Sequence, residues 1–269
     1  SSHSPKPFWL ETIEDIYGIK LKNVLSFFKK SLEAKDIWSF IKADFLIFPC
    51  EEALEPYLKW ERYNKEVHIL NKYKYVTSGI PSVDFKLEKN EARKTLNIPD
   101  DAIVFSYIGR HSEIKGYDLL LKLGEELLTN YKNIYFLIAG KEFPLKGLNH
   151  KRWIEIGWTN DPHSYVNASD VFILPNRETY FDLVLLEVLS LGLTTILSET
   201  GGNLHFKKHK NAEIYFFENN NLESLIIKAK ETISNKEQLG ELRKVNKSIF
   251  EENYSLNPFV KKYIKLYKE

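Results

Sequence analysis

The sequence lacks several features that mark whole classes of protein. It has one cysteine among 269 residues, Cys50, so no internal disulfide can form and no site built from several thiolates is available. No apolar run approaches the ~18–20 residues of a membrane-spanning helix. The 38 basic and 37 acidic side chains nearly cancel, to a net charge of +1, which gives no reason to expect a nucleic-acid partner. We therefore expect a globular protein of a reducing compartment, the cytoplasm.

Methionine is absent altogether, even at the first position. We expect such a beginning to lie inside a larger protein. The length suffices for two small domains or one large one. A turn cluster at 78–82 predicts a boundary, which divides the chain into a domain over 1–82, a second domain over 83–253 and a C-terminal helix over 254–269.

Short apolar segments recur along the second domain, with helical patterns between them. The predicted strands are 103–108, 134–139, 153–156, 171–174, 194–197 and 214–217, and the helices are 117–128, 161–168, 183–191 and 222–233. Continuous rather than alternating apolar strands, separated by helices, indicate a parallel sheet covered on both faces. The sequence therefore predicts a doubly wound α/β domain, Rossmann-like, whose ligand lies at the carboxyl ends of the strands.

The first domain and the tail are rich in lysine and aromatic residues. Residues 21–42 predict an amphipathic helix, 44–48 a buried strand, and 236–252 and 257–269 two final helices. The lysines of the first helix leave two interpretations: a half-buried helix with solvated charges, or an interfacial face in peripheral contact with a membrane.

The first candidate motif joins a predicted strand to a helix and contains Gly109, Arg110, Lys115 and Gly116. Glycines let the backbone approach an anion, the helix start supplies a positive end, and Arg and Lys add full charges. The pattern is neither a P-loop nor a G-x-G-x-x-G motif. The alternative is an ordinary strand–helix turn whose two cations are solvated.

Two further loops follow strands on the same edge of the sheet. The loop 175–182 runs into a helix that carries Glu187 among apolar neighbours, where a carboxylate costs free energy unless donors such as ligand hydroxyls satisfy it. The alternative is a Glu187 that pairs with a nearby lysine or caps a backbone end. The third loop contains Gly201 and Gly202, a weak signal alone that gains weight from its neighbours.

In this order the motifs resemble the C-terminal domain of the group 1 (family 4) glycosyltransferases of the GT-B type. The matching residues are Gly109-Arg110, Lys115-Gly116, Ala139-Gly140, Gly157-Trp158, Ala168-Ser169-Asp170-Val171, Pro175, Glu187 and Gly201-Gly202. The resemblance covers about residues 76–269 and implies a GT-B fold with a second, incomplete Rossmann-like domain. It also implies a retaining, metal-independent transfer of a hexose from a UDP- or GDP-linked donor to a saccharide acceptor, in polysaccharide biosynthesis. No D-x-D motif is present.

The resemblance implies a role for each matching residue. Arg110 and Lys115 would hold the donor diphosphate and stabilise it as it departs, with Gly109 beside them, and Glu187 would bind the ribose hydroxyls. The loop before Glu187 would hold the donor sugar, and Gly201 and Gly202 would lie against the donor.

One departure from the family pattern concerns its pair of glutamates. Glu178 and Glu187 are nine positions apart, whereas the family's pair is eight apart, so Thr179 stands where the first glutamate belongs. Either the loop bulges and Glu178 still reaches the sugar, or Thr179 and Asp182 have taken over. We favour Glu178.

His3, in a Ser-His-Ser context, resembles the first-domain histidine with which the family approaches the transferred centre of the donor sugar. The alternative is a flexible terminal residue or the remnant of a tag. The other histidines show no metal-ligand spacing, and we interpret them as surface or core residues: His68, His111, His150, His163, His205 and His209. We expect no metal and no cofactor beside the donor substrate.

Two rival functions stay open at this point. The first is a nucleotide-sugar epimerase or a phosphorylase-like enzyme of the same fold, which would need other chemistry in the same cleft. The second is a non-catalytic, transferase-like partner subunit, which the irregular glutamate spacing and the short first domain favour.

Overall fold

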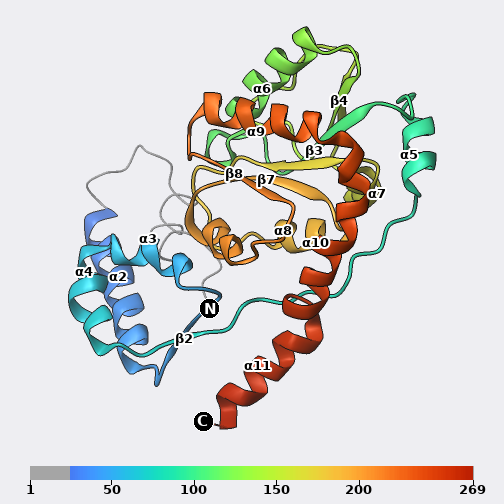
Figure 1. Cartoon of the computed structure of the whole chain (residues 1–269). Coiled ribbons are helices and arrows are strands. Elements are labelled where there is room, and N and C mark those ends of the chain that lie inside the picture. Colours follow the sequence, from blue (N-terminus) through green and yellow to red (C-terminus); the bar gives the residue numbers. More distant parts are fainter. Residues whose placement is uncertain (1–24, 269) are drawn as a thin grey trace.

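The computed structural model describes residues 25–268 and places them in two lobes of unequal size (Figure 1). The larger lobe is built on a parallel sheet in the order β5-β4-β3-β6-β7-β8. The strands are β3 Ile103–Ile108, β4 Ile134–Ala139, β5 Trp153–Gly157, β6 Val171–Leu174, β7 Thr194–Ser198 and β8 Ile214–Phe217. The strand order reverses between β3 and β6, and a ligand crevice forms at such a switch point.

Helices cover both faces of this sheet, which confirms the doubly wound prediction. One face carries α6 (Tyr117–Asn130) and α9 (Leu222–Ser234), and the other carries α5 (Lys89–Thr95), α7 (Pro162–Asn167), α8 (Leu183–Ser190) and α10 (Leu239–Asn253). Every residue of β6 and of β7 is buried. Strands buried on both faces need apolar side chains at every position, so the sequence shows them as continuous apolar runs.

The smaller lobe surrounds a pair of short parallel strands, β1 and β2. Its elements are α2 (Leu25–Lys42), β1 (Leu46–Phe48), η2 (Glu52–Leu54), α3 (Glu55–Leu58), α4 (Glu61–Glu66), η3 (His68–Leu70) and β2 (Tyr73–Tyr75). Aromatic rings fill it: Phe40 lies edge-on to Tyr63 at 5.2 Å between ring centroids, and Phe48 to Tyr57 at 5.2 Å. In the part of the chain that the structure describes, no helix is both long and apolar enough to span a membrane.

The two lobes share one hydrophobic core. Phe48 and Tyr57 of the smaller lobe contact Tyr180, in the loop before α8, at 6.2 Å between ring centroids in each pair. The predicted boundary at 78–82 lies in an extended segment, where Ile80 donates a backbone hydrogen bond to Tyr254 at 3.0 Å. The loop before α8 is therefore held from both lobes.

Several elements differ from the sequence prediction. The predicted helix over 236–252 is a 3-10 turn, η6 (Lys236–Gln238), followed by α10, and the last helix is α11 (Leu256–Lys268). Neither α5 nor β2 was predicted, because one is seven residues without an apolar stripe and the other only three residues.

A buried ion pair holds α5 against the sheet. Arg93, only 3% exposed, donates to Asp170 Oδ2 at 2.7 Å and to the carbonyl of Ala168 at 2.8 Å. Lys89 lies 2.6 Å from the other oxygen of Asp170, and the Val104 amide donates to Asp170 at 2.9 Å. Burial alone would raise the pKa of Asp170, but the cations Lys89 and Arg93 outweigh it and hold this pKa below its ordinary 3.8.

Removal of Arg93 tests this anchor. Arg93→Met removes one of the two cations that neutralise the buried carboxylate of Asp170. We therefore expect a loss of about 3–5 kcal/mol in the free energy of unfolding, measured by urea denaturation. The stabilisation of the ionised Asp170 is fully present above pH 3.8 and is lost as the pH falls through the lowered pKa of the folded state.

The matched control is Arg62→Met, since Arg62 pairs with Glu66 at 2.7 Å on an exposed face of α4. Exposed pairs contribute ~0–1 kcal/mol, and an equal loss in both variants would contradict the anchor.

Candidate active site at the carboxyl edge of the sheet

Three loops leave adjacent strands at the carboxyl edge of the larger sheet. They comprise residues 109–116 after β3, 175–182 after β6 and 199–203 after β7, and β6 pairs with both of the other strands. The predicted site residues of the second domain lie on these loops or at the start of α8. The sheet order thus brings together motifs that are distant in the sequence.

At Gly116 the backbone of the first loop packs directly against the second loop. Its backbone is left-handed, with φ +66°, and a β-carbon there would lie 1.9 Å from the carbonyl oxygen of Pro175. Only glycine tolerates both the conformation and the approach. Lys115, the preceding residue, is thereby fixed beside the second loop.

At Gly201 and Gly202 the backbone of the third loop packs against the second loop in the same way. Gly201 has φ +41°, and its β-carbon would lie 1.9 Å from the carbonyl oxygen of Thr179. A β-carbon on Gly202 would lie 2.2 Å from the carbonyl oxygen of Tyr180. The two glycines therefore have a structural role that does not depend on a ligand.

Charged groups meet where the first and second loops touch. Lys115 Nζ lies 3.2 Å from Asp182 Oδ1, and Asn176 donates to the other carboxylate oxygen. Asp182 precedes the first residue of α8, yet its side chain does not cap that helix. Arg110 is exposed, and its guanidinium has no partner within residues 25–268, although its carbonyl accepts from the Tyr107 hydroxyl at 2.8 Å.

Buried polar atoms without a hydrogen-bond partner in the described chain lie on all three loops. They are Ser112 Oγ on the first loop, Asn176 Oδ1 on the second and Asn203 Oδ1 on the third. Such atoms cost free energy unless something satisfies them. Each of the three loops therefore carries a buried polar atom that the described chain leaves without a hydrogen bond.

Glu187 lies one turn into α8 and pairs with a histidine. His163 Nε2 lies 3.2 Å from Glu187 Oε2, and both side chains are part-buried. The hydrogen bond to Glu187 raises the pKa of His163 above its ordinary 6.5. The sequence predicts that His163 is a surface or core residue, whereas the structure places it beside Glu187. Its position at the start of α7, after the strand that ends at Gly157, is the sequence signal for this place.

Glu178 and Thr179 face different surroundings. Glu178 is exposed and unpaired within the part of the chain that is described, whereas Thr179 is buried against Gly201. Asp182 is the acidic side chain of this loop that contacts Lys115. His3 lies outside the described residues.

A cavity of about 390 Å³ opens beside Asp182, between the two lobes. Among its lining residues are Phe48, Val76, Tyr180, Asp182, Phe259 and Tyr263. The first two belong to the smaller lobe and the last two to α11, so aromatic side chains surround a space next to the charged loops. Aromatic faces of this kind suit the apolar faces of a sugar ring.

Comparison with known proteins identifies the family. The sequence model of "Glycosyl transferases group 1" matches residues 88–248, more than half of the chain. The chain belongs to the group 1 glycosyltransferases. The match begins at α5 and includes all three loops.

Two curated relatives of this group 1 chain carry O-antigen and lipopolysaccharide in their names. The O-antigen biosynthesis glycosyltransferase WclY of Escherichia coli is 31% identical over 132 residues, which are 46% of this chain and 36% of that protein. The lipopolysaccharide 1,2-N-acetylglucosaminetransferase of Salmonella typhimurium is 29% identical over 138 residues, 44% of this chain and 36% of that protein. The matches thus span little more than a third of either relative.

Solved structures support the GT-B fold for this group 1 chain. The Anabaena protein HepE, solved with UDP and glucose, matches with a TM-score of 0.71 at 11% identity, over 89% of this chain and 67% of that one. Sucrose-phosphate synthase from Thermosynechococcus elongatus matches with a TM-score of 0.68 at 17% identity, over 95% of this chain and 64% of that one. At these identities the likeness shows the fold alone.

One group of side chains in the described residues has the composition and spacing to hold a metal ion: Cys50, Glu52 and His205. A single cysteine excludes only metal sites that are built from several thiolates, so it is compatible with this group. Spacing along the sequence did not reveal His205 either, because it comes from the other lobe.

The pairing of Glu187 with His163 makes a testable prediction. Glu187→Gln replaces the charged acceptor that favours the imidazolium with a neutral amide, so the pKa of His163 should fall towards its ordinary 6.5, as measured by NMR titration. Because the folded pKa is raised, the pair stabilises the fold below pH 6.5, and this contribution is lost as the pH rises through the pKa of the folded state.

His150 provides the internal control. It lies outside the site, and burial lowers its pKa, so its titration should not change. An unaltered titration of His163 in the variant would contradict the pairing.

Proposed function

We propose that this chain carries the donor site of a retaining glycosyltransferase that moves a hexose from a UDP- or GDP-linked donor to a saccharide acceptor without a metal. The observation that carries the proposal is the convergence of Arg110, Lys115 and the start of α8 at the carboxyl edge of the sheet. Membership of the family supports it, as do the O-antigen and lipopolysaccharide names of the relatives.

The diphosphate of the donor would lie between the two cations and the amino-terminal end of α8. Backbone N–H groups at a helix start bind anions, and Arg and Lys add full charges. These groups would stabilise the negative charge that grows on the diphosphate as the sugar leaves. Positioning and charge stabilisation then supply the catalysis, with no protein nucleophile.

Asp182 occupies the position that this arrangement assigns to a phosphate. Its carboxylate already neutralises Lys115 at 3.2 Å, so a bound diphosphate must displace it. Once displaced, the side chain lies next to the cavity between the lobes, where a carboxylate would accept hydrogen bonds from sugar hydroxyls. Asp182 therefore serves the donor-sugar position better than the exposed Glu178, which we favoured from the sequence.

Glu187 would bind the ribose hydroxyls from the next turn of α8. Its partner His163 approaches from α7 and orients the carboxylate. The acceptor would enter through the aromatic cavity, because Phe48 and Val76 come from the smaller lobe.

The second candidate is a non-catalytic, transferase-like subunit. The Lys115–Asp182 ion pair favours this candidate, because a permanent pair would keep Lys115 from binding a phosphate. An active enzyme must exchange this contact for the donor, whereas a subunit without catalysis need not.

Calorimetry with UDP, GDP and their hexose conjugates tests the proposal in one series. Lys115→Ala removes a charged donor worth ~1.5–3 kcal/mol, so nucleotide binding should weaken at least tenfold. Asp182→Asn removes the competing charge of a part-exposed pair worth ~1 kcal/mol, so binding of UDP or GDP should tighten about fivefold.

Lys132→Ala is the matched control, since Lys132 is exposed in the turn before β4, at the opposite edge of the sheet. If no nucleotide binds to any form, the donor site is refuted. If nucleotide binds, and sugar is transferred neither to a panel of saccharide acceptors nor to water, the result favours the non-catalytic candidate.

A further inference from the structure

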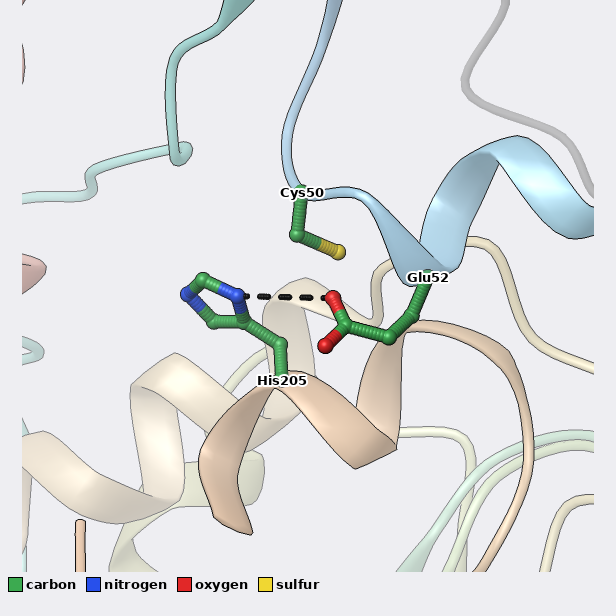
Figure 2. Close-up of side chains that lie close together, drawn as sticks. All are labelled: Cys50, Glu52 and His205. Carbon is green, nitrogen blue, oxygen red and sulfur yellow. Dashed lines mark ion pairs between the residues drawn. The ribbon is translucent and has the colours of Figure 1, made fainter. Parts of the chain in front are cut away.

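Cys50, Glu52 and His205 converge where the two lobes meet (Figure 2). Cys50 follows β1 and Glu52 opens η2, whereas His205 lies in η5 (Gly201–Lys208) of the larger lobe. Their ligand atoms all lie within 4.8 Å of one another, and His205 Nδ1 is 3.6 Å from Glu52 Oε2. Figure 2 shows the sulfur, the ring and the carboxylate directed at one shared space.

From this geometry we infer that the three side chains form a zinc site that joins the lobes. Zinc binds thiolate, imidazole and carboxylate at ~2.0–2.3 Å, so ligand atoms around a tetrahedral ion lie roughly 3.3–3.6 Å apart. The His205–Glu52 distance of 3.6 Å already meets this requirement, and the sulfur, which lies within 4.8 Å of both ligand atoms, must move closer to them. Water would complete the tetrahedron.

A second observation at the same place supports a ligand. Glu52 Oε2 is buried and makes no hydrogen bond in the described residues, since His205 Nδ1 lies 3.6 Å away, beyond hydrogen-bond distance. Cys50 beside it is 2% exposed. A buried carboxylate oxygen in that state costs free energy unless a cation satisfies it. A thiolate and a carboxylate together balance the charge of one divalent ion.

Two protons must move when the metal binds. Lys208 Nζ lies 2.6 Å from His205 Nε2, so without metal Nε2 accepts and the ring proton is on Nδ1, facing Glu52. Zinc takes Nδ1, the ring proton transfers to Nε2, and the exposed Lys208 turns to solvent. The thiol proton of Cys50 leaves to solvent, as metal coordination of a thiol requires.

The site would have a structural role. None of its ligands belongs to the loops 109–116 or 175–182, and β1 and η5 come from different lobes. A bound ion would fix η5, which begins at Gly201, against the smaller lobe.

Cobalt(II) titration of the metal-stripped chain provides the test. Thiolate-to-cobalt charge transfer absorbs in the near ultraviolet, and Cys50 is the only cysteine, so the band reports this residue alone. We expect a 1:1 complex that zinc displaces, a band that is lost in Cys50→Ser, and affinity that falls at least tenfold in His205→Gln and in Glu52→Gln. Lys208→Met should tighten binding, because the ring proton can then move to Nε2 without the loss of the hydrogen bond from Lys208.

His209→Gln is the control, since His209 is a neighbour that hydrogen-bonds Tyr254 at 2.6 Å and is not a ligand; it should bind cobalt as the parent chain does. Circular dichroism checks that each variant is folded, and zinc should raise the melting temperature of the parent but not of Cys50→Ser. Absence of the band in the parent chain, or equal affinity in His205→Gln, would overturn the site.

Discussion

Backbone contact between three loops is the constraint on which this site depends. Gly116 lies against Pro175 and Gly201 against Thr179, each so close that a β-carbon would overlap a carbonyl oxygen. Both glycines have positive φ, which other residues adopt only with strain. Because the loops follow neighbouring parallel strands, the sheet order and the two glycines together determine where Lys115 and Asp182 meet.

That contact concentrates charge in a small space. One cation is neutralised by a carboxylate within the chain, while Arg110 remains unpaired in the described structure. A diphosphate carries more charge than one carboxylate and can also use the N–H groups of α8, so it can replace Asp182 on Lys115. The close contact between the loops therefore has two effects. It brings Lys115 to the site, and it also places Asp182 where it competes with a phosphate for Lys115.

The sheet and its principal helices were predictable, but the pairings within the site were not. The strands from Val171 and from Thr194 are buried along their whole length, so their sequences are continuous apolar runs. Helix α5 has no apolar stripe and is held by Arg93 and Asp170, 77 positions apart, a pairing that no local pattern records. The contacts of Lys115 with Asp182 and of His163 with Glu187 likewise join different loops, so sequence spacing suggested the residues but not their partners.

If these three loops form one nucleotide site, the same nucleotide must protect all of them. Hydrogen–deuterium exchange of the chain with and without saturating UDP or GDP tests it most directly. We expect slower exchange in residues 109–116, 176–187 and 199–203, because a ligand shields and orders these backbone segments. Nucleotide binding that leaves these three segments unchanged and protects other parts of the chain would contradict it.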